Sequence, residues 1–495
     1  MYVFTLQPMI KNLVTPIKLA VLSLCIIVCS SIAANAKDGY NITATVADCD
    51  DSVAYLCYYY GKQSAVYKAD SCKFKPGPSV KIQFKSDKKL EGGIYIILFS
   101  DRGTRCEMLL RNGDDIEVAF SKKDVISTTV YKNSKENRDF IDYQNFLSSV
   151  SAQYETLGKK YEAAKTKADS AEVKKQSKAL ATSVDKYRRD FLRKNPNTLC
   201  GSLLGAMLEP QVPEGKQYLA DKKTVDSLFP QRYYKQHYWD DFNFQDNRLI
   251  YSPIYDGKLE TYFKYVVPTP DSINKAADTL LARARGAKDV FKYTLWWLTR
   301  FTENSKIMGV DESFVYIVEN YYMKGDAFWM HDTMVQKYVD QAQKISPNTI
   351  GKSAPDIRLP DIDGNVTPLI DVTPNHDYTL VIFWASDCGH CKKIVPKLDS
   401  VVSAIKGKVD IKIYGVHTIK DDDLWRKQII EKQLNDNWLH LHDPMRTGAW
   451  RKLYNVYSTP VVYLIDRSGK IVGKRLDHTN LEGLVDFLER KRKAK

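Results

Sequence analysis

Two cysteines at a spacing suited to redox chemistry, Cys388 and Cys391, lie in the run Trp384-Ala385-Ser386-Asp387-Cys388-Gly389-His390-Cys391. The run joins a predicted strand, Tyr378–Ala385, to a predicted helix, Cys388–Ile405. At a helix start the unpaired backbone N–H groups and the helix dipole favour the thiolate of the first cysteine. The second cysteine, one turn further on, can close a small disulfide ring. The spacing therefore predicts a thiol–disulfide exchange pair with Cys388 as the nucleophile.

The residues beside the two cysteines should tune their chemistry. A positively charged His390 would favour the Cys388 thiolate, which stabilises the reduced form and makes the disulfide more oxidising. Asp387 carries the opposite charge and should raise the thiol pKa. The two effects oppose each other, so the sequence leaves the reduction potential open.

Other uses of the motif are weaker interpretations. No second CxxC or HxxxH completes a zinc site. A peroxiredoxin-type peroxidase needs Thr or Ser three residues before its reactive cysteine, and Ala385 stands there. An inert structural disulfide stays open. His440 and His442 would face the same side of a short strand, as two metal ligands could, but we favour packing or surface histidines next to Asp443. We therefore expect neither a metal nor an organic cofactor.

The elements that must position this pair begin at Gly351. Strand-like runs alternate with helical stretches, and the order is βαβα, a hairpin through Ser468-Gly469 and a final helix. Alternating strands and helices indicate a central sheet with helices on both faces. The predicted strands are Tyr378–Ala385, Val409–Val416, Pro460–Asp466 and Lys470–Arg475, and the predicted helices are Cys388–Ile405, Asp421–Leu434 and Leu481–Glu489.

The first folded region, residues 37–125, has apolar residues at period two, separated by Gly-rich turns such as Gly77-Pro78 and Gly92-Gly93. This pattern predicts an all-β, antiparallel, sandwich-like domain. The predicted strands include the alternation from Tyr40 to Val46 and from Val80 to Phe84, together with Val53–Tyr60, Ile94–Phe99 and Ile116–Phe120.

Four cysteines fall in this region, and two disulfides among them are feasible, with three possible connectivities. Buried free thiols are the competing interpretation. Cys200 stands apart and is our candidate for a thiol without a partner. The four cysteines are Cys49, Cys57, Cys72 and Cys106.

Residues 133–346 have a helical period. Apolar residues from Tyr143 to Tyr161 recur every three or four positions, and a second helix should end near Asn195-Pro196. The aromatic run Tyr233–Phe244 and the pair Trp296-Trp297 could serve as a ligand platform, but core packing is the interpretation we favour. The sequence predicts an all-α domain without a catalytic constellation.

Residues 1–36 have the form of a signal peptide, with Lys11 and Lys18, an apolar run and the cleavage motif Ala34-Asn35-Ala36. Val28 precedes Cys29 where lipidation requires a small residue, which argues against a lipid anchor. The net charge is +13, but the Lys and Arg residues are spread along the chain and mixed with acidic residues, so we expect no nucleic-acid partner. These features predict a protein of the periplasm or cell envelope.

Residues 351–495 resemble the thioredoxin superfamily, particularly its exported TlpA/ResA-like thiol–disulfide oxidoreductases. The resemblance rests on Ala354-Pro355, Asp363-Gly364, Phe383-Trp384-Ala385 with the CGHC motif, Pro396 and Thr459-Pro460. It implies that Pro460 is cis and packs beside the disulfide. It also implies that Thr459 offers backbone hydrogen bonds to a substrate strand, and that Trp384 supports the reactive loop.

The chain departs from this family at two acids. Ile382 replaces the buried acid of thioredoxins, and Ile394 replaces a glutamate of the ResA-like branch. The usual proton acceptor for Cys391 is therefore missing. The whole layout also resembles exported Gram-negative proteins that join a β domain, a helical domain of unknown function and a thioredoxin-like tail, through Tyr238-Trp239-Asp240-Asp241-Phe242 and Ile350-Gly351-Lys352.

We therefore expect an exported multidomain enzyme that exchanges disulfides with exported proteins carrying cysteines or disulfides. It would be supplied with electrons by a membrane donor. The alternative is a client- or ligand-binding protein in which the thioredoxin-like domain only docks. The loss of both acids motivates that alternative.

Overall fold

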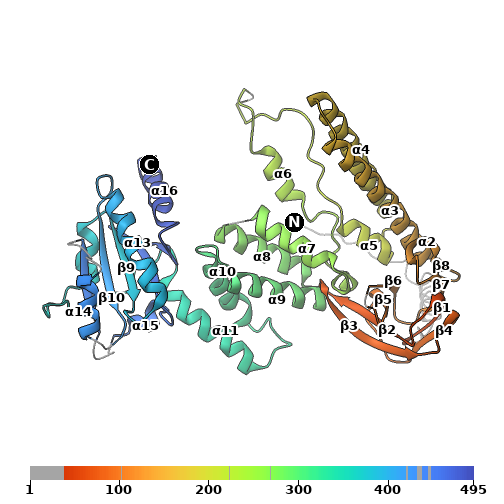
Figure 1. Ribbon diagram of the computed structural model, residues 1–495, viewed down its shortest axis with the longest axis horizontal. Helices are drawn as coiled ribbons and strands as arrows, with labels where there is room; N and C mark the ends of the chain where they lie inside the picture. Colours follow the sequence, from red (N-terminus) through yellow and green to blue (C-terminus); the bar gives the residue numbers. More distant parts are fainter. Residues whose placement is uncertain are drawn as a thin grey trace, which may run out of the picture. The chain divides into compact units, whose positions relative to one another are not determined.

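The computed structural model describes residues 38–101, 103–221, 223–267, 269–419, 422–431, 437–443 and 448–494 (Figure 1). The predicted signal peptide, residues 1–36, lies outside these residues. Within them, no helix combines the length and apolar character needed to cross a membrane. The chain forms two compact units that divide between Lys258 and Leu259, inside the region predicted as all-α.

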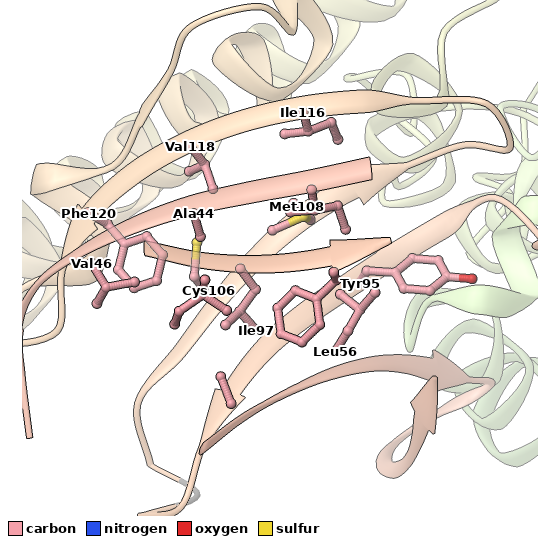
Figure 2. Packing of buried hydrophobic residues seen from close by; sticks show 14 of the residues in the cluster. Ala44, Val46, Leu56, Tyr95, Ile97, Cys106, Met108, Ile116, Val118 and Phe120 are labelled. Carbon is pink, nitrogen blue, oxygen red and sulfur yellow. The ribbon is translucent and has the colours of Figure 1, made fainter. Parts of the chain in front are cut away.

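The first unit begins with two four-stranded sheets, in the strand orders β4-β1-β7-β8 and β3-β2-β5-β6. Alternate side chains of both sheets point into one shared core, which makes the domain a sandwich as predicted (Figure 2). The strands are β1 Tyr40–Cys49, β2 Val53–Tyr60, β3 Lys62–Lys73, β4 Gly77–Ser86, β5 Gly93–Phe99, β6 Arg105–Leu110, β7 Asp115–Ser121 and β8 Val130–Tyr131.

The prediction of a purely antiparallel domain is wrong at one pair. β1 pairs antiparallel with β4 but parallel with β7, where Ile42 faces Ile116 and Val46 faces Phe120. The first and last long strands of the domain thus lie side by side, a non-local pairing that local periodicity does not report. The polar strand β3 lacks the apolar alternation that marks the other strands.

The cysteines of this domain form no disulfide. All seven cysteines of the described residues are free thiols, so the disulfide interpretation is corrected in favour of free thiols. Cys49, Cys57 and Cys106 are buried, and Cys72 is partly exposed. Strand register explains why, because Cys72 faces Ala54 and Cys106 faces Ile97 instead of another cysteine.

Helices complete the first unit (Figure 1). α3 and α4 pack against each other, and Asn195 forms the C-cap of α4, next to the predicted stop. Trp239, Phe242 and Phe244 are buried around Tyr255, so this end of the aromatic run is core, whereas Tyr233 and Tyr234 are only half-buried. The elements are α2 Val125–Thr128, α3 Lys135–Glu162, α4 Lys167–Lys194, α5 Leu199–Ala206, α6 Phe229–His237, η1 Asn247–Tyr251 and α7 Ile254–Thr261, which spans the division between units.

The second unit opens with further helices. Trp297 is buried against Phe263 and Phe301, whereas Trp296 is exposed. Core packing is therefore confirmed for Trp297 and wrong for Trp296. The elements are η2 Tyr262–Val266, α8 Pro270–Ala284, α9 Lys288–Asn304, α10 Val310–Ile317, η3 Val318–Tyr322, α11 Asp332–Ile345 and η4 Ser346–Asn348.

The C-terminal sheet has the order β11-β10-β9-β12-β13. β9, β10 and β11 are parallel, while β12 and β13 run antiparallel to their neighbours. The remaining elements are α12 Leu369–Val372, η5 Thr373–Asn375, β9 Tyr378–Trp384, α13 Gly389–Ile405, β10 Ile411–His417, α14 Asp422–Glu431, β11 Trp438–His442, α15 Trp450–Leu453, β12 Val461–Asp466, β13 Ile471–Lys474 and α16 Leu481–Lys493.

Both faces of this sheet are covered, as the alternation of strands and helices predicted. Leu380, Ile382 and Trp384 of β9 point into the core with α13 and α16, and Val381 and Phe383 point into the core with α12 and α15. A strand buried on both faces is continuously apolar, which is the pattern of β9. This central strand ends directly before the cysteine motif.

Candidate active site

The cysteine pair lies where β9 ends and α13 begins. Cys388 is the N-cap of α13, and its Sγ accepts a hydrogen bond from the Cys391 N–H at 3.4 Å. Cys388 is partly exposed, whereas Cys391 is only 1% exposed. The geometry separates an accessible sulfur at a helix N-terminus from a buried sulfur one turn on.

The loop before β12 faces the accessible sulfur. The Thr459–Pro460 peptide bond is cis, as the resemblance implied. The Cys388 thiol donates a hydrogen bond to the Thr459 carbonyl oxygen, with sulfur and oxygen 3.2 Å apart. Thr459 therefore contacts Cys388 through its backbone carbonyl, and its side chain also hydrogen-bonds the sulfur.

The two thiols have opposite pKa shifts. Partial burial would raise the pKa of Cys388, but hydrogen bonds from the Thr459 side chain and from the N–H groups of Cys391 and His390 outweigh it, so this pKa is lowered. Deeper burial dominates at Cys391 and raises its pKa to about 12, against the hydrogen bond from the Ala385 N–H. Cys388 is thus the thiol that ionises first.

His390 acts differently from the sequence-based expectation. Its side chain is exposed, and it lowers the pKa of Cys388 through its backbone N–H. The side chain of Asp387 is also exposed. The start of the helix presents the backbone N–H of residue 390 to the sulfur. This N–H lowers the pKa of Cys388, as the sequence had led us to expect of the imidazole.

Trp384, which we expected to support the loop, contacts a histidine that sequence reasoning missed. It is buried, and its ring meets that of His417 edge-on with centroids 5.0 Å apart. The His417 Nε2 accepts the Ser386 N–H at 3.3 Å and lies 3.0 Å from Ser386 Oγ. The available signal was that His417 directly follows the predicted strand Val409–Val416, and its pairing with Trp384 requires the sheet register.

Ile382 and Ile394, which stand where the resembled family has acids, differ in their surroundings. Ile382 is fully buried in the core. Ile394 lines a cavity of about 390 Å³ together with His390, Pro460 and Asp311, and Asp311 belongs to α10. A carboxylate therefore does face this cavity, but it comes from the helical region instead of α13.

His440 and His442, which were considered as metal ligands, lie two positions apart in β11 and therefore on the same face of the sheet. His442 pairs with His417 in register, and their ring centroids are 5.3 Å apart. The His442 Nε2 lies 2.6 Å from the Ile419 carbonyl oxygen. Across the described parts of the chain, no cluster of three or more His, Cys, Asp or Glu residues is arranged to hold a metal ion.

Family models match two stretches of the chain. Residues 350–474 match the AhpC/TSA family, and residues 222–354 match a domain of unknown function, DUF5106. The C-terminal domain is therefore a thioredoxin-like domain of the AhpC/TSA family, and it follows a helical domain of unknown function.

Parts of the chain are similar to individual relatives and solved structures. The thiol–disulfide oxidoreductase ResA of Bacillus cereus is 26% identical over 162 residues, covering 32% of this chain and 86% of the relative. A domain of a possible thiol–disulfide isomerase from Cytophaga hutchinsonii is 32% identical, with 30% of this chain and 99% of that chain covered and a TM-score of 0.28. A thioredoxin-like protein from Bacteroides caccae is 18% identical, with 55% and 97% covered and a TM-score of 0.43.

Proposed function

We propose that this protein is an exported thiol–disulfide oxidoreductase that exchanges disulfides with exported protein clients through Cys388 and Cys391. The observation that carries the proposal is the asymmetry of the two sulfurs. Cys388 is accessible, lies at a helix start and has a lowered pKa, and buried Cys391 lies one turn behind it. Nucleophilic attack requires a thiolate, and the first sulfur is the one that supplies it.

The exchange proceeds in two balanced steps. The Cys388 thiolate attacks one sulfur of a client disulfide, so a mixed disulfide forms and the second client sulfur leaves as a thiolate that takes up a proton. The Cys391 thiol then loses its proton, and its sulfur attacks Cys388, which releases the first client sulfur. The client gains two electrons, and the Cys388–Cys391 pair becomes a disulfide.

Export is part of the proposal. It rests on the signal-like residues 1–36 and on the similarity to ResA. A membrane electron donor would reduce the Cys388–Cys391 disulfide after each turnover. Thr459 and Pro460 would shape the surface on which the client strand docks, and Trp384 would hold the loop.

A trapping experiment tests the function. The variant Cys391→Ser, expressed with export intact, should accumulate mixed disulfides with exported proteins because the second attack is removed. Cys388→Ser should accumulate none, and Cys200→Ser should behave as the wild type because Cys200 is a fully buried residue of α5 in the first unit. A protein that traps no client and does not reduce insulin would instead be the docking module of the alternative function.

A further inference from the structure

The helical region contributes directly to a cavity beside the cysteine motif. The cavity of about 390 Å³ contacts the motif through His390 and the cis-proline loop through Pro460. Asp311 and Asn348, from the helical part of the same unit, line it as well. A client whose sulfur reaches Cys388 therefore brings its neighbouring residues to the mouth of this cavity.

Buried polar contacts fix the helical wall in place. The Lys474 ammonium lies 2.7 Å from the Asp311 carboxylate, and it donates to the backbone and side-chain oxygens of Asn348 at 3.0 and 2.9 Å. Lys474 and Asp311 are 3% and 5% exposed. Asn348 also donates to the Leu453 carbonyl at 2.9 Å. The Lys474 ammonium is therefore paired with partners inside the wall.

Arg475 gives the cavity a positive charge that is more exposed than the charge of Lys474. Its guanidinium donates to the Ser305 carbonyl at 3.2 Å and lies 3.6 Å from Asp311, which already pairs with Lys474. The side chain remains 48% exposed, and a guanidinium has five N–H donors. The other lining acid, Asp477, accepts the N–H and the hydroxyl of Thr479 on its Oδ1, at 2.8 and 2.5 Å.

We propose that this cavity is a client subsite that takes an acidic side chain close in sequence to the client's reactive cysteine. The inference rests on the proposed oxidoreductase function and names its substrate class. Arg475 supplies the charge that recognises the carboxylate, and the His390 side chain lines the same cavity. Asp311 is a positioning residue, because it holds Lys474 and Arg475 against the helical wall.

Three peptide disulfides that differ only by Glu, Gln or Lys beside the cysteine test this subsite. In a single round of reaction, the reduced full-length protein should react with the Glu peptide with a second-order rate constant about five- to tenfold above that for the Gln peptide, the effect of one partly solvated charge-assisted hydrogen bond. The Lys peptide should be the slowest. The preference should shrink when salt is raised to about 0.5 M, because salt screens partly exposed charges.

Variants separate the subsite from the general charge of the domain. Arg475→Gln should bring the Glu and Gln peptides to within about twofold of each other. Arg467→Gln should keep the preference, because Arg467 also contacts a backbone carbonyl and a carboxylate, those of His376 and Asp377, but does not line the cavity. Persistence of the preference in Arg475→Gln, or equal rates for all three peptides in the wild type, overturns the subsite.

The underlying function can fail separately. Hydroxyethyl disulfide carries no charge and has no side chain to fill the cavity. A wild type that reduces neither this compound nor any peptide overturns the oxidoreductase function and the subsite with it. A wild type that reduces hydroxyethyl disulfide but shows no peptide preference overturns the subsite alone.

Discussion

The two sulfurs of the motif differ in the water and the hydrogen-bond donors that reach them. Cys388 receives hydrogen bonds from backbone N–H groups at the start of α13 and is partly exposed, whereas Cys391 lies in the core beneath it. A charged sulfur is stabilised by the first environment and destabilised by the second. The same CxxC therefore contains a nucleophile and a thiol that stays protonated until the first has reacted.

Alkylation of the reduced protein should show this difference. The rate at Cys388 should rise with pH through a midpoint below the ordinary thiol value of ~8.5, because a lowered pKa places the thiolate at lower pH. Cys391 should stay unmodified until the pH approaches its pKa of about 12. Mass spectrometry of iodoacetamide-treated protein over a pH series gives both curves.

Thr459→Val provides a matched test of the cause. Valine keeps the carbonyl that faces Cys388 but removes the hydroxyl, so the Cys388 midpoint should move to higher pH. Thr182→Val removes an exposed hydroxyl in α4 and should leave the midpoint unchanged. An unchanged midpoint in Thr459→Val would assign the lowered pKa to the helix start alone.

At the scale of elements, strand register decides which cysteines can meet. Cys49 ends β1, Cys57 lies in β2, Cys72 in β3 and Cys106 in β6, and the first, second and last are buried. Cys106 packs among Val46, Ile97 and Met108 in the sandwich core (Figure 2). In these positions the thiols act as small apolar core residues.

Thiol counting distinguishes this arrangement from a disulfide framework. In the unreduced protein, the four β-domain cysteines should all react with a thiol reagent after unfolding. In the folded state Cys72 should be the one of these four that reacts, because burial raises the pKa of Cys106 to about 12 and also raises that of Cys57. An intact mass that increases by four hydrogens on reduction of this domain would contradict the prediction.

At the scale of the molecule, the second unit joins helical and thioredoxin-like parts through buried polar contacts. β13 ends at Lys474, and the segment from Ser305 to Asp311 receives Lys474 and Arg475. Burial lowers the pKa of Lys474, and the nearby Asp311 opposes this shift. A buried cation of this kind needs its partners, because removal of one of them leaves a charge in the interior.

Asp311→Asn should therefore destabilise the second unit by about 3 kcal/mol. The expected result is a lower denaturant midpoint, with faster hydrogen exchange in α10 and β13. Asp271→Asn is the control, because its carboxylate is 90% exposed and lies 3.7 Å from Lys275. Equal midpoints for the two variants would mean that the buried pair does not hold the unit together.

Much of the fold was predictable because its signals are local. The period-two alternation, the apolar strand β9 and the helix stop at Asn195 depend on residues close together in the chain, and the structure has them where predicted. The parallel β1–β7 pair, the contact of His417 with Ser386 and the exposure of Trp296 depend on which distant segments meet. Local periodicity holds no information about such encounters.

By itself, the amino-acid sequence determined the order of a strand-rich, a helical and a thioredoxin-like part, and it singled out Cys388 and Cys391, since a helix start and a CxxC spacing are properties of a short segment. Only the tertiary structure decided that Thr459 helps to lower the pKa of Cys388, and that Asp311 lines the cavity beside Ile394. It also decided that the β-domain cysteines stay apart. Burial, register and partner choice are set by residues far apart in the sequence, so they exist only once the chain has packed.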